Sequence, residues 1–77
     1  MGLEIKVRPR LAELLKEKGL TQLKLSEKSG VPQGAISRFD RSVQHKDEIL
    51  FRIAHALGVS IQDLFEVEIK EKPDADQ

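Results

Sequence analysis

Residues 19–41 read GLTQLKLSEKSGVPQGAISRFDR, two short helical segments broken by Ser-Gly-Val-Pro. Thr21 is a good N-cap for the first segment, because its hydroxyl can accept a hydrogen bond from a free backbone N–H of the first turn. Gly30 ends that segment, since glycine readily adopts the left-handed conformation found at helix ends. The second segment carries a narrow apolar seam, Ile36 and Phe39. Two helices joined by a short turn containing glycine are typical of a helix-turn-helix, which we predict at residues 21–41.

The segments on either side of this region predict three more helices. A first helix runs from about Pro9 to Lys18, with proline in its first turn and glycine directly after its end. After a loop at residues 42–46, Asp47 is a good N-cap for a fourth helix that ends near Gly58. A capping box at residues 60–63 predicts a short fifth helix. The fold class expected is therefore all-α, with five helices.

Both ends of the chain alternate apolar and charged residues, which is the period of a β-strand. The alternating segments are residues 3–8 and 65–70. Parallel pairing in the matching register would oppose like charges, which repel, whereas antiparallel pairing opposes unlike charges. The favourable pairs are Glu4 with Lys70, Lys6 with Glu68, and Arg8 with Glu66. The sequence therefore predicts a short antiparallel β-ribbon, closed within one chain or between two subunits.

One face of this ribbon needs a cover, because two strands alone are only marginally stable in water. We expect that face to pack on helices of the chain or on a second subunit. The side chains to be covered are Leu3, Ile5, Val67 and Ile69.

The composition favours one small domain with neither disulfides nor a metal centre. The 77 residues include no cysteine, and His45 and His55 have no partners at metal-ligand spacing. There is neither a leader pattern nor a long apolar segment, so we expect a cytoplasmic protein without membrane contact. No phosphate loop or nucleophile constellation is present, so we expect no enzymatic activity and no cofactor.

The net charge of zero conceals a gradient along the chain. Residues 1–20 hold five basic and three acidic residues, residues 21–46 hold five and two, and residues 47–77 hold three and eight. The helix-turn-helix thus lies in the most basic part. We predict a single domain over residues 1–69, followed by a flexible acidic tail over residues 70–77.

Several motifs follow one another at a characteristic spacing: Thr21-Gln22, Leu25-Ser26, Gly30-Val31, Gln33 and Ile36-Ser37-Arg38, then residues 52–60 and 63–65. In this the sequence resembles the DNA-binding domain of Cro and lambda-type phage repressors, the XRE family. The resemblance covers about residues 10–66. It implies a repressor-like five-helix domain whose third helix enters the major groove of double-stranded DNA while the second lies across the phosphates.

The resemblance implies base contacts from four positions of the third helix: Gln33, Gly34, Ser37 and Arg38. Gln33 can pair with adenine or reach a phosphate, and Arg38 suits the two acceptors of guanine. Ser37 lies between them and can serve as a weaker hydrogen-bond donor or acceptor. Gly34 stands where the family usually has a longer polar side chain; it removes one readout group but lets the backbone approach DNA closely.

Contacts to phosphates are expected from five further residues: Thr21, Gln22, Arg41, His45 and Lys46. Gln22 would donate at the start of the second helix, together with backbone N–H groups. The three basic residues, Arg41, His45 and Lys46, flank the loop that follows the third helix. Arg38 has an alternative role, an ion pair with Asp40 or Glu27 on the protein surface.

The implied function is a sequence-specific transcriptional regulator. We expect a repressor that acts as a homodimer, because one short recognition helix reads few base pairs. An alternative is a protein-binding module such as the antitoxin of a toxin–antitoxin pair, in which residues 66–76 would bind the protein partner. The predicted dimer surface is the ribbon together with exposed apolar residues of the C-terminal part of the chain. These residues are Ile49, Phe51, Ile61 and Val67, the last of which lies in the ribbon itself.

Overall fold

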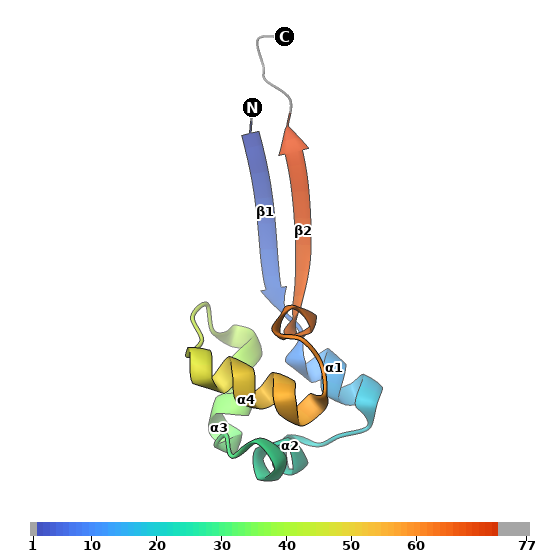
Figure 1. Cartoon of the computed structure of the whole chain (residues 1–77), viewed down its shortest axis with the longest axis vertical. Helices are drawn as coiled ribbons and strands as arrows, with labels where there is room; N and C mark the ends of the chain where they lie inside the picture. The colour runs from blue at the N-terminus through green and yellow to red at the C-terminus, as the bar shows by residue number, and fades with distance from the viewer. Residues whose placement is uncertain (1, 73–77) are drawn as a thin grey trace.

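The computed structural model describes residues 2–72, which form a small helical body and a two-stranded ribbon that projects from it (Figure 1). The helices and strands follow the order β1 (Gly2–Pro9), α1 (Leu11–Lys18), α2 (Gln22–Ser29), α3 (Gln33–Arg38), α4 (Asp47–Leu57) and β2 (Phe65–Lys72). Two 3₁₀ turns, η1 (Phe39–Arg41) and η2 (Ile61–Leu64), follow α3 and precede β2. The ribbon makes the molecule elongated, with principal extents of 54, 23 and 18 Å.

The helical body is built around apolar side chains from the four helices, from the turn before α3 and from both 3₁₀ turns. Those with almost no exposed surface are Leu11, Leu25, Val31, Phe39, Ile53 and Leu64. The predicted cap of α2 is confirmed, since the Thr21 hydroxyl accepts a hydrogen bond from the backbone N–H of Lys24 at 3.1 Å. Gly30 ends α2 with φ at 77°, a conformation that other residues adopt at a cost.

The predicted helix-turn-helix fold with an antiparallel ribbon is confirmed, but the prediction of five helices is wrong, and the sheet means that the fold is not purely all-α. Only four α-helices are present in residues 2–72, beside a two-stranded sheet. The predicted capping box exists, with Ser60 and Asp63 bonded to each other's backbone, but it starts the 3₁₀ turn η2. That turn has only four residues because the chain is already extended at Phe65, where β2 begins. A capping box specifies how a helical turn starts, not how long it continues.

Three helix ends also differ from their predicted positions. The third helix was expected to reach Arg41, but α3 stops at Arg38 and the chain tightens into η1. The first helix was expected to start at Pro9, but that residue ends β1 and α1 starts at Leu11. Asp47 is the first residue of α4 rather than its N-cap, which is Lys46.

The start of α1 is capped by a residue from a distant part of the chain. The Asp40 carboxylate in η1 accepts hydrogen bonds from the backbone N–H groups of Leu11 at 2.8 Å and Ala12 at 3.0 Å. Arg10, the residue at the N-cap position itself, supplies no side-chain cap. Free N–H groups at a helix start favour a negative charge, so Asp40 joins η1 to α1.

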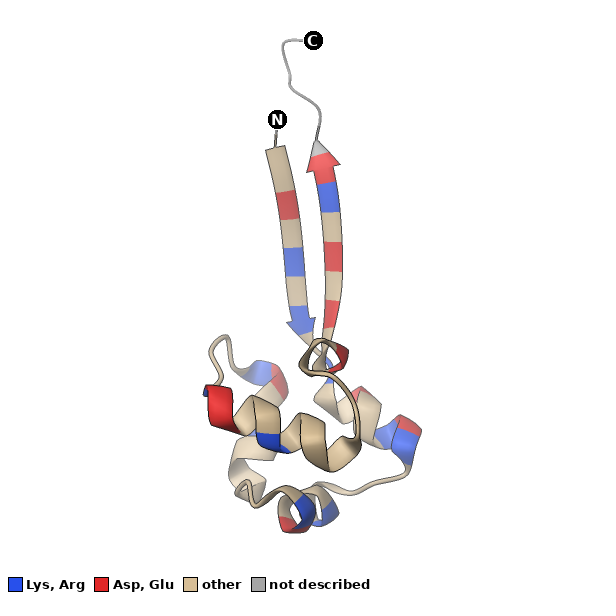
Figure 2. Ribbon diagram, in the orientation of Figure 1, with Lys and Arg blue, Asp and Glu red and all other residues tan. Residues whose placement is uncertain are grey.

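The antiparallel ribbon closes within one chain and has the predicted register. Ile5 lies opposite Ile69 and Val7 opposite Val67, and each expected pair of unlike charges is aligned. Figure 2 shows these charges distributed over both strands. Arg8 donates to one carboxylate oxygen of Glu66 from two nitrogens, at 2.9 and 3.2 Å. This hydrogen bonding and the charge of Glu66 raise the pKa of the Arg8 guanidinium above its usual value.

The ribbon is longer than predicted, and its apolar face is open. The strands run over Gly2–Pro9 and Phe65–Lys72, so the tail predicted from residue 70 would start no earlier than residue 73. The remainder of that predicted tail, residues 73–77, lies outside the described residues. Of the two covers expected for the apolar face, helices of the same chain are absent, because the aliphatic residues of this face are 38–64% exposed; a second subunit stays a prediction. These residues are Leu3, Ile5, Val7, Val67 and Ile69. Within the described residues, no helix has the length and apolar character to cross a membrane.

Replacing Asp40 by alanine should lower the free energy of unfolding by about 1–2 kcal/mol, because two N–H groups at the start of α1 lose their acceptor. Asp40→Asn should cost less, since the amide retains one acceptor oxygen. Both values can be measured by urea denaturation followed by circular dichroism.

The matched control is Asp47→Ala, which removes an aspartate at the start of α4 that accepts no hydrogen bond from a helix N–H. This change should cost no more than about 0.5 kcal/mol, the contribution of a charge near a helix end. Equal losses for Asp40→Ala and Asp47→Ala would show that the Asp40 cap does not stabilise the fold.

Candidate nucleic-acid interface

The turn between α2 and α3 is fixed by two serine hydroxyls. Ser26 donates to the carbonyl of Val31 at 2.6 Å. Ser29 donates to the carbonyl of Leu25 at 2.7 Å and accepts from the N–H of Val31 at 3.1 Å. Val31 itself is buried, so the turn is held by hydrogen bonds on its polar groups and by packing on its side chain. The role of Ser29 was not predicted from the sequence.

Helix α4 supports the same turn from the other side. Arg52 donates from Nη1 to the carbonyl of Ser29 at 3.2 Å, and from Nε to the carboxylate of Glu48 at 2.7 Å. A Cβ atom built on Gly30 would lie 3.0 Å from Nη1 of Arg52. Glycine is therefore favoured here by its positive φ, and a side chain at this position would also require the Arg52 guanidinium to shift slightly.

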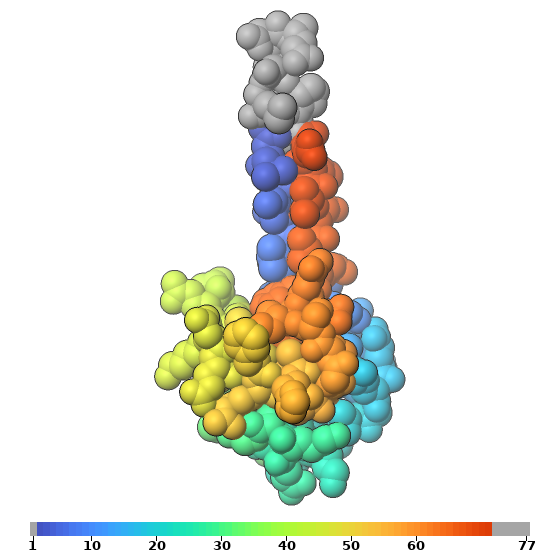
Figure 3. Space-filling view, in the orientation of Figure 1, coloured from blue at the N-terminus to red at the C-terminus, as the bar shows by residue number. Residues whose placement is uncertain are grey.

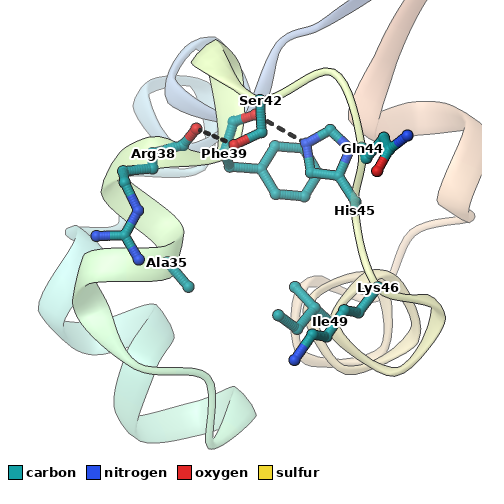
Figure 4. A pocket seen from close by; sticks show the side chains of 8 residues that line it. All are labelled: Ala35, Arg38, Phe39, Ser42, Gln44, His45, Lys46 and Ile49. Carbon is teal, nitrogen blue, oxygen red and sulfur yellow. Dashed lines mark hydrogen bonds between the residues drawn. The ribbon is translucent and has the colours of Figure 1, made fainter.

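The exposed side of α3 carries the four residues that sequence predicted for base contacts: Gln33, Gly34, Ser37 and Arg38. Ile36 and Phe39, from the opposite side, are buried in the core. Positions separated by three and four residues share one face of a helix, so the four exposed residues form a continuous strip. Figure 4 shows the Arg38 side chain directed away from the body.

The Arg38 guanidinium lies over Gly34. A Cβ atom built on Gly34 would be 3.2 Å from Nη1 of Arg38, closer than ordinary van der Waals contact. The alternative role for Arg38, a surface ion pair, is absent from residues 2–72: Asp40 caps α1, and Glu27 lies 3.9 Å from Lys24. The arginine is therefore free to bind a ligand in front of α3.

The five predicted phosphate contacts lie in two places, the start of α2 and the segment after α3. Thr21 caps α2, which leaves its O–H free to donate outward. Gln22 is half-buried beside it, whereas Arg41 and Lys46 are exposed. These positions surround the α3 strip on two sides.

His45 has a packing role that the sequence did not indicate. Its Nε2 donates to the carbonyl of Phe39 at 2.8 Å, and its ring lies against Phe39 and Phe65 with centroid distances of 4.1 and 5.7 Å. Only Nδ1 remains for the predicted phosphate contact. The histidine attaches the loop to the end of α3 and to the base of β2.

A hollow of about 200 Å³ separates the end of α3 from the start of α4 (Figure 4). Arg38 and Lys46 flank it, and Ser42 is held at its rim by a hydrogen bond to the carbonyl of Arg38 at 3.0 Å. Two cations beside a hollow suit an anionic group such as a phosphate. Within the part of the chain described, no three histidine or acidic residues are grouped so that they could hold a metal ion.

Comparison with known proteins identifies this arrangement. The helix-turn-helix family HTH_3, which comprises domains of the XRE and lambda-repressor type, matches residues 11–64. The chain is an XRE-type helix-turn-helix protein. No curated protein and no solved structure matches it.

The XRE-type domain spans α1 to η2 and leaves out both strands of the ribbon. Membership of this family assigns the chain to DNA-binding transcription regulators and confirms the predicted family. The candidate interface of the XRE-type domain is the α3 strip with the start of α2 and the loop at residues 42–46.

Replacing Gly34 by alanine should stabilise the domain by up to about 1 kcal/mol, because alanine is the better residue within a helix. The new methyl group should also displace the Arg38 guanidinium, so the preference of the XRE-type domain for bases opposite this arginine should change. Urea denaturation and binding to a set of duplexes varied at single positions measure the two effects.

The matched control is a double-mutant cycle with Arg38→Ala. If Gly34 acts by leaving space for the Arg38 guanidinium, Gly34→Ala should have no effect on base preference once the arginine is absent. Additive effects of the two changes would show that the residues act independently.

Proposed function

We propose that this protein is a sequence-specific repressor of transcription that binds double-stranded DNA as a homodimer, with α3 in the major groove. The observation that carries the proposal is the strip of Gln33, Ser37 and Arg38. These polar side chains are exposed, lie on one helix and, among residues 2–72, form no ion pair that would compete with a base. We further propose that the protein works in the cytoplasm and is not an enzyme.

The proposed base contacts follow from the chemistry of each side chain. Arg38 would donate two hydrogen bonds to N7 and O6 of guanine, and Gln33 would pair with N6 and N7 of adenine. Ser37, between them, would donate or accept at a third base. Gly34 would allow close approach of the helix and keep the Arg38 guanidinium near the groove.

The proposed phosphate contacts would set the orientation of α3. Gln22 and the free N–H groups at the start of α2 would hold one phosphate. Arg41 and Lys46, on the other side of the strip, would hold the next phosphate along the same DNA backbone. The serine hydrogen bonds at the turn support this proposal because they fix the angle between the two helices.

The proposed dimer follows from the small size of this reading surface, and the proposed repression follows from the DNA that the dimer covers. Helix α3 has six residues and can contact only a few base pairs, which is too little to distinguish one site in a genome. Two copies on a palindrome would double the contacts, with half-site centres about 34–36 Å apart. Such a dimer would exclude other proteins from the DNA that it covers.

The antitoxin alternative receives less support from the position of the acidic residues. Its partner-binding arm begins at Glu66, but this residue and Glu68 lie in β2 opposite Arg8 and Lys6. A protein partner that used the Glu66 carboxylate would have to compete with its ion pair with Arg8, and at Glu68 it would face the positive charge of Lys6 on the neighbouring strand.

Selection from a random duplex pool near physiological salt should enrich a palindrome. On that site, Arg38→Ala should weaken binding about tenfold to a hundredfold and relax one position of each half-site, with little change on random DNA. Gln22→Ala should weaken binding to all sequences alike, because phosphates are the same in every sequence.

Two results would contradict the proposal. A pool without enrichment would show that the domain does not read sequence. Equal losses for Arg38→Ala on the selected site and on random DNA would show that the arginine only contacts phosphates.

A further inference from the structure

One face of the ribbon is apolar along most of its length. Residues directly opposite one another in an antiparallel pair share a face, so the register places five aliphatic side chains together: Leu3, Ile5, Val7, Val67 and Ile69. All five are substantially exposed. Figure 3 shows the ribbon standing clear of the helical body, so none of the helices shields it in this view.

The opposite face of the ribbon is charged rather than apolar. It carries the three pairs of unlike charges, including the two hydrogen bonds between Arg8 and Glu66. Unlike charges that lie opposite one another across the strands and are open to water need no further partner. The two faces therefore differ: only the apolar face has unfavourable contact with solvent.

The apolar surface continues from the ribbon onto the helical body. A hollow of about 230 Å³ lies at the base of this face, lined by Val7, Pro9, Ser42, Val43, His45 and Phe65. The loop at residues 42–46 borders it and places Val43 in water with 97% of its side chain exposed. Figure 3 shows this loop protruding from the body beside the ribbon base.

The open area has the size of an interaction surface. The five aliphatic side chains expose on the order of 400 Å², which is the size of patch that usually has a function in a monomeric protein. Two such faces in contact, with the loop included, would bury on the order of 1,000 Å² in total, the lower limit for a specific interface. Residues 73–77 read PDADQ and offer no large apolar side chain as a cover.

We propose that the apolar face of the ribbon, together with Val43, is the surface on which a second copy of this chain docks through the same face. The face is nearly self-complementary, because isoleucine stands opposite isoleucine and valine opposite valine across the two strands. A two-fold axis can thus bring equal side chains of the two copies together. The centre of the face carries no charge, so a charged partner has no group to recognise there.

This assignment names the contact surface of the dimer in the proposed function and depends on that dimer, but its test needs no DNA. It also narrows the surface predicted from sequence. Ile49 and Ile61 pack against the core, and Phe51, although exposed, lies on α4 outside the ribbon face.

Sedimentation velocity of the full chain should show a dimer at tens of micromolar. Ile5→Lys should raise the dimer dissociation constant at least a hundredfold, because a charge would then be buried in each copy. The matched control is Leu23→Lys on α2, at the end of the body remote from the ribbon (Figure 1); the two side chains are 52% and 56% exposed. It should leave the dimer intact. A monomeric wild-type chain, or an Ile5→Lys variant that dimerises normally, would overturn the proposal.

Cross-linking provides a second test that does not depend on a destabilising charge, because the chain has no native cysteine. Among Leu3→Cys, Ile5→Cys and Val7→Cys, at least one should form a disulfide-linked dimer under mild oxidation. Lys6→Cys and Glu68→Cys, on the charged face, should cross-link at least tenfold more slowly. Equal rates from both faces would overturn the assignment.

The two proposals fail in different ways. A monomer that still selects a DNA sequence would overturn the ribbon dimer and leave base reading by α3 intact. A ribbon-dependent dimer that selects no sequence would support this surface and contradict the proposed function.

Discussion

The position of α3 depends on the hydrogen bonds of the turn between α2 and α3. Three polar groups of this turn, the Ser29 hydroxyl and the N–H and C=O of Val31, are paired with each other or with Ser26. Each would cost about 1–3 kcal/mol if it were buried without a partner. The turn therefore has one favourable geometry, and α3 cannot rotate about it without losing several of these bonds. A surface that reads bases needs this rigidity, because its donors must meet fixed acceptors in the groove.

The features that sequence predicted correctly depend on local rules. Helical periodicity located α2 and α4, and glycine located their ends. The ribbon register was predictable although its strands are far apart in the chain, because one alignment pairs unlike charges at three positions. Helix length was less predictable: the capping box at Ser60 was correct, but the extended conformation at Phe65 limited it to a 3₁₀ turn.

The features that sequence did not reveal join distant residues through directional hydrogen bonds. Asp40 caps α1 across 29 positions, and Arg52 reaches the carbonyl of Ser29 across 23. At the candidate interface, the family resemblance named the base-contact residues, and the predicted apolar seam of Ile36 and Phe39 is buried on the other side of α3, so that these residues are exposed. The packing of His45 on Phe65 escaped prediction because it depends on where the base of β2 meets the loop.

The ribbon also determines where the two ends of the described chain lie. Gly2 is paired with Lys72, so the first and last strand residues are neighbours at the tip, and α2 lies at the opposite end of the molecule (Figure 1). A protein fused to either end would be held away from α2 and the turn that follows it. A short peptide joining the two strand ends would make the backbone circular with little strain. New termini could then be opened in a surface loop without disturbing the order of the helices.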